Sequence, residues 1–425
     1  RTLSLKARKS VLPFGVHYII LAGVFEIQTS WQGGEKMSSR TLTSKKIIGI
    51  DASRNRSGGA KAHLKGILNS FNEKLLQKIE QIHVWSYSEL LGLLPQAKWL
   101  IKHNPKDLEK SLFHQLWWQY EKLPKEAKRL QIDILFNTDA STVCNFRPSV
   151  TMSRDLLPFD KREFCRYGLS KEMARLIVLR YLQSNSLKRS TGVIFLTKYA
   201  SDTIQRHVGS LSEYTIIPHG VGDNFRLNKN LEKKSFLVNH DKIKCIYVSA
   251  IAPYKHQWNI VLAISALRRE GYNIHCKFVG GGEGRAQKLF NSIVRSIKDS
   301  PSFIEQTGSV DHDQIPEYLK DSDIFIFASS CENMPNILIE GMCSGLPIAC
   351  SNREPMPEIL RDGGLYFDPE DINSIIHCLK LIIKDDELRN RISSVSKRLS
   401  EEFSWERCSY ETFSYLCKVI ETYKK

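Results

Sequence analysis

Short apolar runs alternate with amphipathic stretches along most of this 425-residue chain, and this alternation limits the fold more than any other feature. The first run, 46–51, is typical of a buried strand, and the apolar residues of 60–71 then follow helical spacing. Strands that alternate with helices form parallel, doubly wound sheets. The same pattern predicts further strands at 82–85, 134–137, 150–153, 193–197 and 214–217, and helices that include 105–122 and 171–183.

The alternation lapses between 222 and 244, where the sequence is rich in Asn and Lys, and then begins again. We therefore expect two Rossmann-like domains, 37–222 and 223–400, followed by a helix in 401–425. Ligands of such sheets bind at the carboxyl ends of the strands, so we expect the functional residues between the domains. In the second half the pattern predicts strands at 245–249, 274–279, 323–327, 347–350 and 365–367, and a helix at 257–270.

The first 36 residues do not follow this pattern. Met37 is the first methionine, and the apolar run 11–25 contains His17. This run is shorter than the roughly 20 residues of an ordinary membrane span. We interpret 1–36 as a non-core N-terminal extension, and the alternative is a signal-type apolar segment.

Cysteine spacing and charge indicate the compartment and the kind of partner. The ten cysteines lack CxxC or zinc-ligand spacing, which favours a reduced, cytoplasmic compartment with most cysteines buried. The formal net charge is +15, and 161–206 alone holds ten basic and three acidic residues. Such a surplus favours an anionic partner, which is a nucleic acid, an anionic lipid surface or a phosphorylated substrate.

The densest group of candidate functional residues lies in 330–347. Glu332 and Glu340 have seven residues between them, and Pro335 suits the first turn of a helix. Helical rise then places the two carboxylates ~10 Å apart, with Glu332 on the loop near the positive helix N-terminus. This distance suits the two ends of one extended ligand and is too long for an acid/base dyad. On spacing alone, two solvated surface carboxylates are the alternative.

From 243 to about 406 the chain resembles the retaining family-4 glycosyltransferases of the GT-B fold, in which two Rossmann-like domains face a central cleft. The resemblance rests on several motifs in register. They are Glu332 and Glu340, Gly345-Leu-Pro347, Pro357-Glu358 with 363–369 after it, and, upstream, 307–310 and 319–327. The resemblance also implies that the final helix, which contains Trp405, crosses back to the N-terminal domain.

The resemblance implies roles for the residues of this segment. Glu340 would accept hydrogen bonds from the ribose hydroxyls of a donor nucleotide, and Glu332 would contact the transferred sugar near the reacting carbon. The backbone amides of 333–336 would face the donor sugar or phosphate. The donor-binding candidates of this loop are Asn333, Met334, Pro335 and Asn336.

A second element of the family is an arginine, four residues and a lysine, and both cations contact the donor diphosphate. Lys255 matches the lysine, and we expect it to act in catalysis beside Glu332. Ala250 stands at the arginine position, so half of this clamp is missing. Without the resemblance, an exposed lysine is usually only solvated.

Gly58 and Gly59 follow the first strand and resemble the glycine loop that touches the donor diphosphate from the N-terminal domain. Glycines let backbone amides approach a phosphate closely, although a lone Gly-Gly after a strand is more often a turn. Arg54 or Arg56 is a candidate for the cation that is missing at position 250.

Arg154, followed by Asp155, occupies the place where many relatives have a histidine-aspartate pair beside the donor sugar. We interpret Arg154 as a donor-binding candidate that contacts an anion of the donor or the acceptor. His219 stands in a loop that resembles the Pro-Asn-Gly-Val turn of the family, and we interpret it as structural.

No metal site and no cofactor are expected. The two Asp-x-Asp patterns, Asp311-His-Asp313 and Asp321-Ser-Asp323, precede a strand instead of following its carboxyl end, so we interpret both as structural. The resemblance implies a metal-independent enzyme, and the catalytic base is not identified by any motif.

Together these features predict a retaining glycosyltransferase that moves a hexosyl group from a UDP- or GDP-sugar to a hydroxyl of a saccharide or lipid-linked saccharide. One alternative keeps the fold and changes the reaction, as a sugar-nucleotide epimerase or a phosphorylase. The other is a basic nucleic-acid-binding protein, which the lack of an aromatic-basic RNA motif or a DNA-reading helix disfavours, so we expect no nucleic acid as partner.

The basic segment 161–206 suggests a location on the inner face of the plasma membrane. Arg175, Arg180, Lys188 and Arg189 would contact an anionic leaflet, and those of Leu176, Ile177 and Leu182 that are exposed would enter the interface. An ordinary packed helix with a solvated basic face is the alternative.

Overall fold

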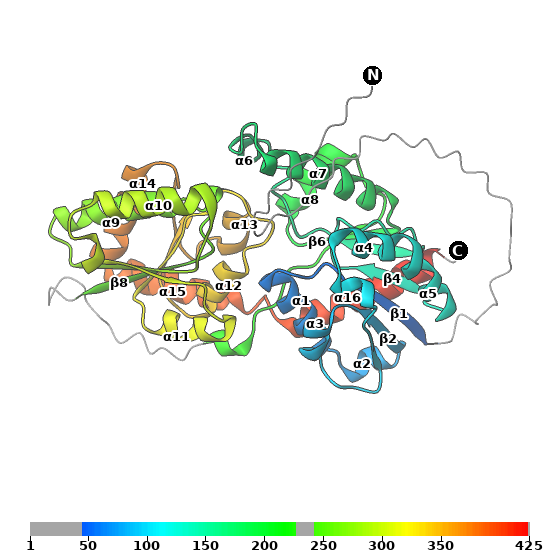
Figure 1. The fold of residues 1–425 in the computed structure, drawn as a ribbon. Helices are drawn as coiled ribbons and strands as arrows, with labels where there is room; N and C mark the ends of the chain where they lie inside the picture. Colours follow the sequence, from blue (N-terminus) through cyan, green and yellow to red (C-terminus); the bar gives the residue numbers. More distant parts are fainter. Residues whose placement is uncertain (1–44, 227–241, 424–425) are drawn as a thin grey trace, which may run out of the picture. The chain divides into compact units, whose positions relative to one another are not determined.

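The computed structural model describes residues 45–226 and 242–423, so the proposed extension 1–36 and most of the interdomain segment lie outside the described residues. The described chain forms two parallel sheets connected by helices (Figure 1). The predicted pair of doubly wound, Rossmann-like units is therefore confirmed.

The first sheet has the strand order β3-β2-β1-β4-β5-β6-β7, so the chain starts in the middle and builds outward in both directions. Its central strands are buried along their whole length because helices follow them in the chain and pack on the sheet. The strands are β1 Lys46–Asp51, β2 Ile79–Trp85, β3 Leu100–His103, β4 Ile134–Asn137, β5 Ser149–Met152, β6 Gly192–Phe195 and β7 Tyr214–Ile216. The helices are α1 Gly58–Asn69, α2 Glu73–Leu76, α3 Ser88–Gly92, α4 Leu112–Trp117, α5 Leu123–Arg129, α6 Lys161–Cys165, α7 Lys171–Arg189 and α8 Lys198–Val208.

The second sheet has the order β10-β9-β8-β11-β12-β13, again with its first strand near the middle. The strands are β8 Ile243–Val248, β9 Ile274–Val279, β10 Ile304–Gly308, β11 Ile324–Phe327, β12 Ile348–Ser351 and β13 Leu365–Phe367. The helices are α9 Gln257–Arg269, α10 Gly284–Ser296, α11 Ile315–Lys320, α12 Asn336–Cys343, α13 Met356–Leu360, α14 Ile372–Lys384 and α15 Asp386–Ser400.

The last helix, α16 (Trp405–Tyr423), packs against the first half of the chain. In Figure 1 this red helix lies among the blue and cyan elements, and the Ser409 hydroxyl donates to the Ile67 carbonyl at 2.7 Å. Gly66 is required at this contact, because a Cβ there would lie 2.3 Å from the Trp405 indole.

Two sequence expectations differ from the structure. The predicted helix 105–122 is broken into a 3-10 turn (Lys106–Glu109), α4 and a π turn (Trp118–Lys122). The break lies at Lys110, whose extended backbone precedes Ser111 at the N-terminus of α4. The edge strands β3 and β10 were not predicted, because each is short and half exposed and so lacks a continuous apolar run.

Among the described residues, no helix combines the length and the apolar character that crossing a membrane requires.

Candidate active site

Lys255 and Glu332 lie together at the carboxyl ends of two neighbouring strands, β8 and β11. Lys255 ends a short 3-10 turn (Pro253–Lys255), and the Tyr247 hydroxyl holds this turn by donating to the Lys255 carbonyl at 2.6 Å. The Lys255 ammonium donates to Glu332 Oε1, and only 13% and 15% of the two side chains are exposed. The two residues predicted to act in catalysis therefore form a nearly buried ion pair.

Glu340 lies inside α12, and the helix begins at Asn336 immediately after Pro335, as predicted. Its side chain is 7% exposed, and His312 Nε2 lies 2.8 Å from Oε1. The hydrogen bond to Glu340 raises the pKa of His312 above its usual value. The second oxygen, Oε2, is buried without a hydrogen-bond partner among the described residues. Glu340 therefore has one free acceptor atom.

Arg154 follows β5 and is enclosed, with 13% of its side chain exposed. Its Nη2 donates to Asn55 Oδ1 at 3.0 Å and lies 3.5 Å from Asp139 Oδ2. Burial lowers the pKa of Arg154, while for Asp139 the charge of Arg154 and the Ser141 hydrogen bonds outweigh burial and lower the pKa. Nε and Nη1 of Arg154 are buried without a hydrogen-bond partner in the part of the chain that the structure describes. The guanidinium thus keeps donors for a further acceptor.

The glycine loop lies next to the start of α12. A Cβ on Gly59 would lie 3.5 Å from Asn336 Nδ2, whereas a Cβ on Gly58 would meet open space. Arg56 is already engaged, because its guanidinium stacks 3.6 Å from the Tyr87 ring centroid and donates to the Leu108 carbonyl. Of the two candidates for the missing cation, Arg54 remains.

The loop before α12 is tied to the first half of the chain. The Asn333 amide donates to the Ser153 carbonyl at 3.4 Å, and the Thr197 hydroxyl donates to the Asn333 carbonyl at 2.9 Å. The backbone N–H of His219 donates to the Met334 sulfur. Burial lowers the pKa of His219 to about 3, so this imidazole stays neutral. A structural role, as predicted from the turn motif, is consistent with these contacts.

His63 was not identified from the sequence. It lies in α1, and both of its ring nitrogens are buried without a hydrogen-bond partner among the described residues, 45–226 and 242–423. Its ring centroid is 4.7 Å from that of His219. Burial, together with His219 and Arg154, lowers its pKa well below the usual value. A polar residue within the otherwise apolar face of the 60–71 pattern is the only signal that the sequence offers.

Four of the predicted donor-binding residues therefore carry buried polar atoms without a hydrogen-bond partner among the residues described. Each such atom costs about 1–3 kcal/mol when it stays unpaired, and native proteins contain few of them. They come from both halves of the chain, on the loop after β5, the loop before α12 and α12 itself, and such atoms suit a ligand with donors and acceptors of its own. The atoms are Nε and Nη1 of Arg154, Oδ1 of Asn333, Oδ1 of Asn336 and Oε2 of Glu340.

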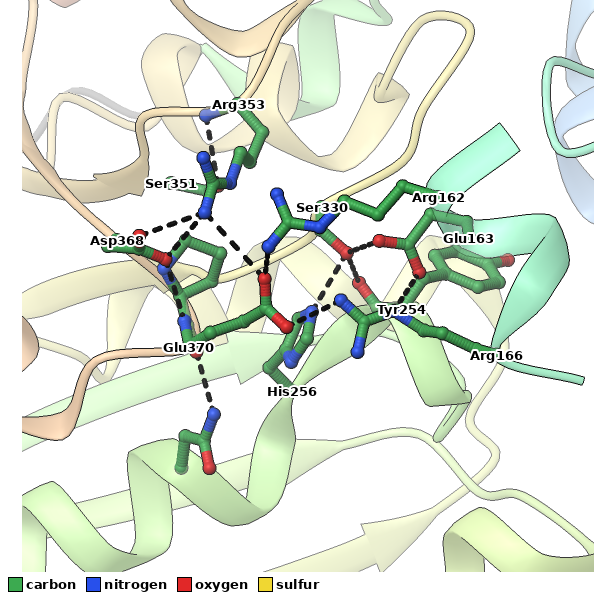
Figure 2. Close-up of polar contacts among 12 residues, drawn as sticks. Arg162, Glu163, Arg166, Tyr254, His256, Ser330, Ser351, Arg353, Asp368 and Glu370 are labelled. Carbon is green, nitrogen blue, oxygen red and sulfur yellow. Dashed lines mark hydrogen bonds and ion pairs between the residues drawn. The ribbon is translucent and has the colours of Figure 1, made fainter. Parts of the chain in front are cut away.

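A network of polar and charged side chains connects α6 to the loops that carry Lys255 and Glu332 (Figure 2). Arg162 and Arg166 both contact the Glu370 carboxylate, and Arg166 Nε lies 2.6 Å from Glu163. The Ser330 hydroxyl donates to Glu163 at 2.8 Å. His256 Nε2 lies 2.8 Å from the same hydroxyl, and burial lowers the pKa of His256 to about 4. Since His256 follows Lys255 and Ser330 precedes Glu332 by two residues, the network positions both members of the ion pair.

Two further motifs have structural partners. Glu358 accepts hydrogen bonds from the backbone N–H groups of Lys198 and Tyr199 at 2.7 and 2.8 Å, which caps the first turn of α8. Asp323 accepts from the Lys244 N–H, and Asp311 caps a 3-10 turn. These contacts agree with the structural interpretation of the Asp-x-Asp patterns.

Comparison with known proteins gives the same fold and a family match over residues 228–398. Residues 228–398 match the family described as glycosyl transferases group 1. O-antigen chain mannosyltransferase B of Escherichia coli is 25% identical over 170 residues, which are 40% of this chain and 44% of the relative. An uncharacterized glycosyltransferase of Haemophilus influenzae is 30% identical over 134 residues, 31% of this chain and 36% of the relative. The chain thus spans less than half of the length of these curated relatives.

Solved structures resemble nearly the whole described chain. Sucrose-phosphate synthase of Thermosynechococcus elongatus superposes with a TM-score of 0.68 at 13% identity, covering 89% of this chain and all of that one. HepE of Anabaena in complex with UDP gives a TM-score of 0.66 at 15% identity and covers 88% of this chain and all of that one. The chain therefore has the GT-B fold, and its residues 228–398 match the group 1 glycosyl transferases.

Proposed function

We propose that the protein is a retaining glycosyltransferase that moves a hexosyl group from a UDP- or GDP-sugar to a hydroxyl of a saccharide or lipid-linked saccharide, without a metal ion. The observation that carries the proposal is the set of unpaired polar atoms on Arg154, Asn333, Asn336 and Glu340. A nucleotide sugar supplies both ribose and sugar hydroxyls and an anionic diphosphate. The family match over 228–398 and the complexes of HepE with UDP and with UDP and glucose support this choice.

The unpaired atoms of Glu340 and Arg154 each have a matching group on such a donor. The free Oε2 of Glu340 accepts a hydrogen bond from a ribose hydroxyl, and a charged acceptor makes this bond strong. The unused N–H groups of Arg154 donate to an anionic oxygen of the donor. Gly58 and Gly59 at the start of α1 offer backbone amides to the diphosphate.

The Lys255–Glu332 pair carries the chemical step. As the bond from the sugar to the diphosphate breaks, negative charge gathers on the leaving phosphate oxygen, and a nearby ammonium lowers the barrier. Glu332 holds the Lys255 ammonium in place before the donor binds and then contacts the transferred sugar. Removing Lys255 should therefore weaken the binding of a nucleoside diphosphate more than the binding of the free nucleoside.

We propose that α7 brings the protein to an anionic membrane surface. Ile177, Val178 and Tyr181 are 54%, 56% and 67% exposed, and Arg175 and Lys188 are exposed on the same helix. Leu176 is 2% exposed and packs in the protein core, so it does not meet the condition of exposure and is not part of this surface. The exposed apolar residues of α7 are Ile177, which was expected, together with Val178 and Tyr181, which were not.

Thermal unfolding with a panel of UDP- and GDP-sugars tests the donor assignment directly. A ligand at one hundred times its dissociation constant adds about 2.7 kcal/mol to the free energy of unfolding. We expect one nucleotide series to stabilise the wild-type protein and the Arg154→Gln variant to respond less. The proposal would be contradicted if none of the nucleotide sugars stabilised the protein. Product analysis with and without an acceptor separates transfer from epimerisation or phosphorolysis.

A further inference from the structure

A second polar site lies in the first half of the chain, where the loop 138–148 meets the end of α7. A small surface pocket there has a cavity volume of about 40 Å³, well below that of a site for a drug-sized ligand, so it can hold only a small group. We call it the Arg147/Arg189 pocket. Its polar lining also includes Asn137, Thr142, Ser186 and Ser190.

The charge of the pocket is positive. Arg147 and Arg189 line it and are exposed, and neither guanidinium has an ion-pair or hydrogen-bond partner within residues 45–226 and 242–423. The lining contains no Asp or Glu, and burial raises the pKa of Cys144 to about 12, so this thiol is neutral. The C-terminus of α7 contributes only about half a negative charge, which two guanidinium groups exceed. An anion is therefore the favoured ligand.

The floor of the pocket has unused hydrogen-bonding groups. Asn137 and Ser186 are each 3% exposed, and Asn137 Oδ1 and Ser186 Oγ have no partner among the described residues. The Asn137 Nδ2 bond to Thr151 Oγ1, at 3.1 Å, fixes the amide in place. An oxyanion would select the opposite amide orientation, in which Nδ2 faces the pocket and the Thr151 hydroxyl donates to Oδ1. The lining of the pocket then offers two buried donors in addition to the two guanidinium groups.

We propose that the Arg147/Arg189 pocket binds a phosphate group, either as free phosphate or as the phosphate of an organic ester. Guanidinium groups bind the tetrahedral oxyanion through several N–H groups at once, and hydroxyl and amide donors complete its coordination. The pocket is connected to the donor site through the chain, since Asn137 precedes by two residues Asp139, the ion-pair partner of Arg154. Phosphate binding would fix the start of this loop.

Calorimetric titration of the full-length protein with inorganic phosphate, at constant ionic strength, tests the pocket. We expect saturable binding that Arg189→Gln and Arg147→Gln each weaken about tenfold, the effect of one lost charge-assisted hydrogen bond. Lys188→Gln is the matched control, because it removes the same charge from the neighbouring exposed residue outside the lining. Lys255→Ala should leave this binding unchanged, so the result does not depend on the donor site.

Ser186→Ala gives a second, independent test. It removes a buried hydroxyl that lacks a partner, so unfolding temperature should stay equal or rise while phosphate affinity falls. Dihexanoyl phosphatidic acid, compared with inorganic phosphate, identifies the source of the ligand: tighter binding of the ester indicates an organic phosphate, and its exclusion indicates free phosphate. Absence of saturable phosphate binding, or an equal loss in Lys188→Gln and Arg189→Gln, would overturn the proposal.

Discussion

At the scale of single residues, the sequence identifies side chains but not their partners. Glu332, Glu340 and Lys255 were found from motif spacing, and the structure places each at a carboxyl end of the second sheet or on α12. The contact between Lys255 and Glu332 joins residues 77 positions apart, and no local pattern contains that information. His63 was missed for the same reason, because a buried polar residue is recognised as unusual only when its missing partners are known.

Replacement of Glu340 by Gln should weaken binding of the donor nucleotide. The variant loses the charge that strengthens the proposed hydrogen bond from a ribose hydroxyl to Oε2, and the loss of such a bond costs about 1.5–3 kcal/mol, or roughly ten- to a hundredfold in affinity. Isothermal titration with UDP and GDP measures this effect. Glu317→Gln on the exposed surface of α11 is the control and should bind as the wild type does. Equal affinities in the wild type and both variants would show that Glu340 does not contact the nucleotide.

The contact between His312 and Glu340 predicts a pH dependence of stability. The pKa of His312 is raised above 6.5 in the folded state, mainly by its hydrogen bond to Glu340, with Asp313 adding to the effect and burial and Lys65 opposing it. A group whose pKa is higher in the folded state than in the unfolded state stabilises the folded protein at pH values below the unfolded-state pKa. This contribution is lost as the pH rises through the folded-state pKa. His312→Asn should therefore lower the unfolding temperature more at about pH 6 than at about pH 9. A difference that is the same at both pH values would contradict the ion pair.

At the scale of elements, agreement depends on how completely a segment is buried. β4, β9 and β13 have the predicted bounds, and α12 begins where Pro335 indicated. α6, with only five residues, was not predicted, although it supplies Arg162 to the network around Glu370. Short elements contain too few residues to show a hydrophobic period. The roles of their side chains depend on contacts with residues that are distant in the sequence.

The exposed face of α7 should mediate binding to anionic vesicles. The double variant Ile177→Ser/Val178→Ser removes two exposed apolar side chains and should reduce co-sedimentation without loss of folding. Binding should also fall with added salt, because exposed charges are screened over ~10 Å at 0.1 M. Leu289→Ser on α10, which is 43% exposed in the wild type, is the control. Equal binding to neutral and anionic vesicles, or binding to neither, would contradict the proposed attachment to an anionic membrane. The glycosyl acceptor would then be a soluble molecule.

At the scale of the whole molecule, the order of the elements was enough to predict the fold. Two runs of alternating strands and helices gave two doubly wound units, and the GT-B structures of sucrose-phosphate synthase and HepE have the same architecture. The contacts that join the halves were not predictable. They consist of single side chains, such as Glu358 on the first turn of α8 and Glu370 between two arginines, and the sequence around these residues has no distinctive pattern.

Replacement of Glu370 by Gln should loosen the connection between α6 and the second sheet. Arg166 and Glu370 are 27% and 30% exposed, so their interaction is worth about 0.2–1 kcal/mol. A double-mutant cycle with Arg166→Gln measures this coupling, and its value should fall with added salt. Turnover should fall as well, because the network positions Ser330 and His256 beside the ion pair. A coupling energy of zero together with normal turnover would assign Glu370 to the solvent-exposed surface.

We propose that this chain transfers a hexosyl group with retention, using the Lys255–Glu332 pair. NMR analysis of products formed from UDP- and GDP-sugars with a panel of saccharide acceptors tests it most directly. The account predicts a product with the anomeric configuration of the donor, and a loss of turnover of about ten- to a hundredfold in Glu332→Gln, whose fold and nucleotide affinity persist. An inverted anomer, or equal turnover in Glu332→Gln and the wild-type protein, would contradict it.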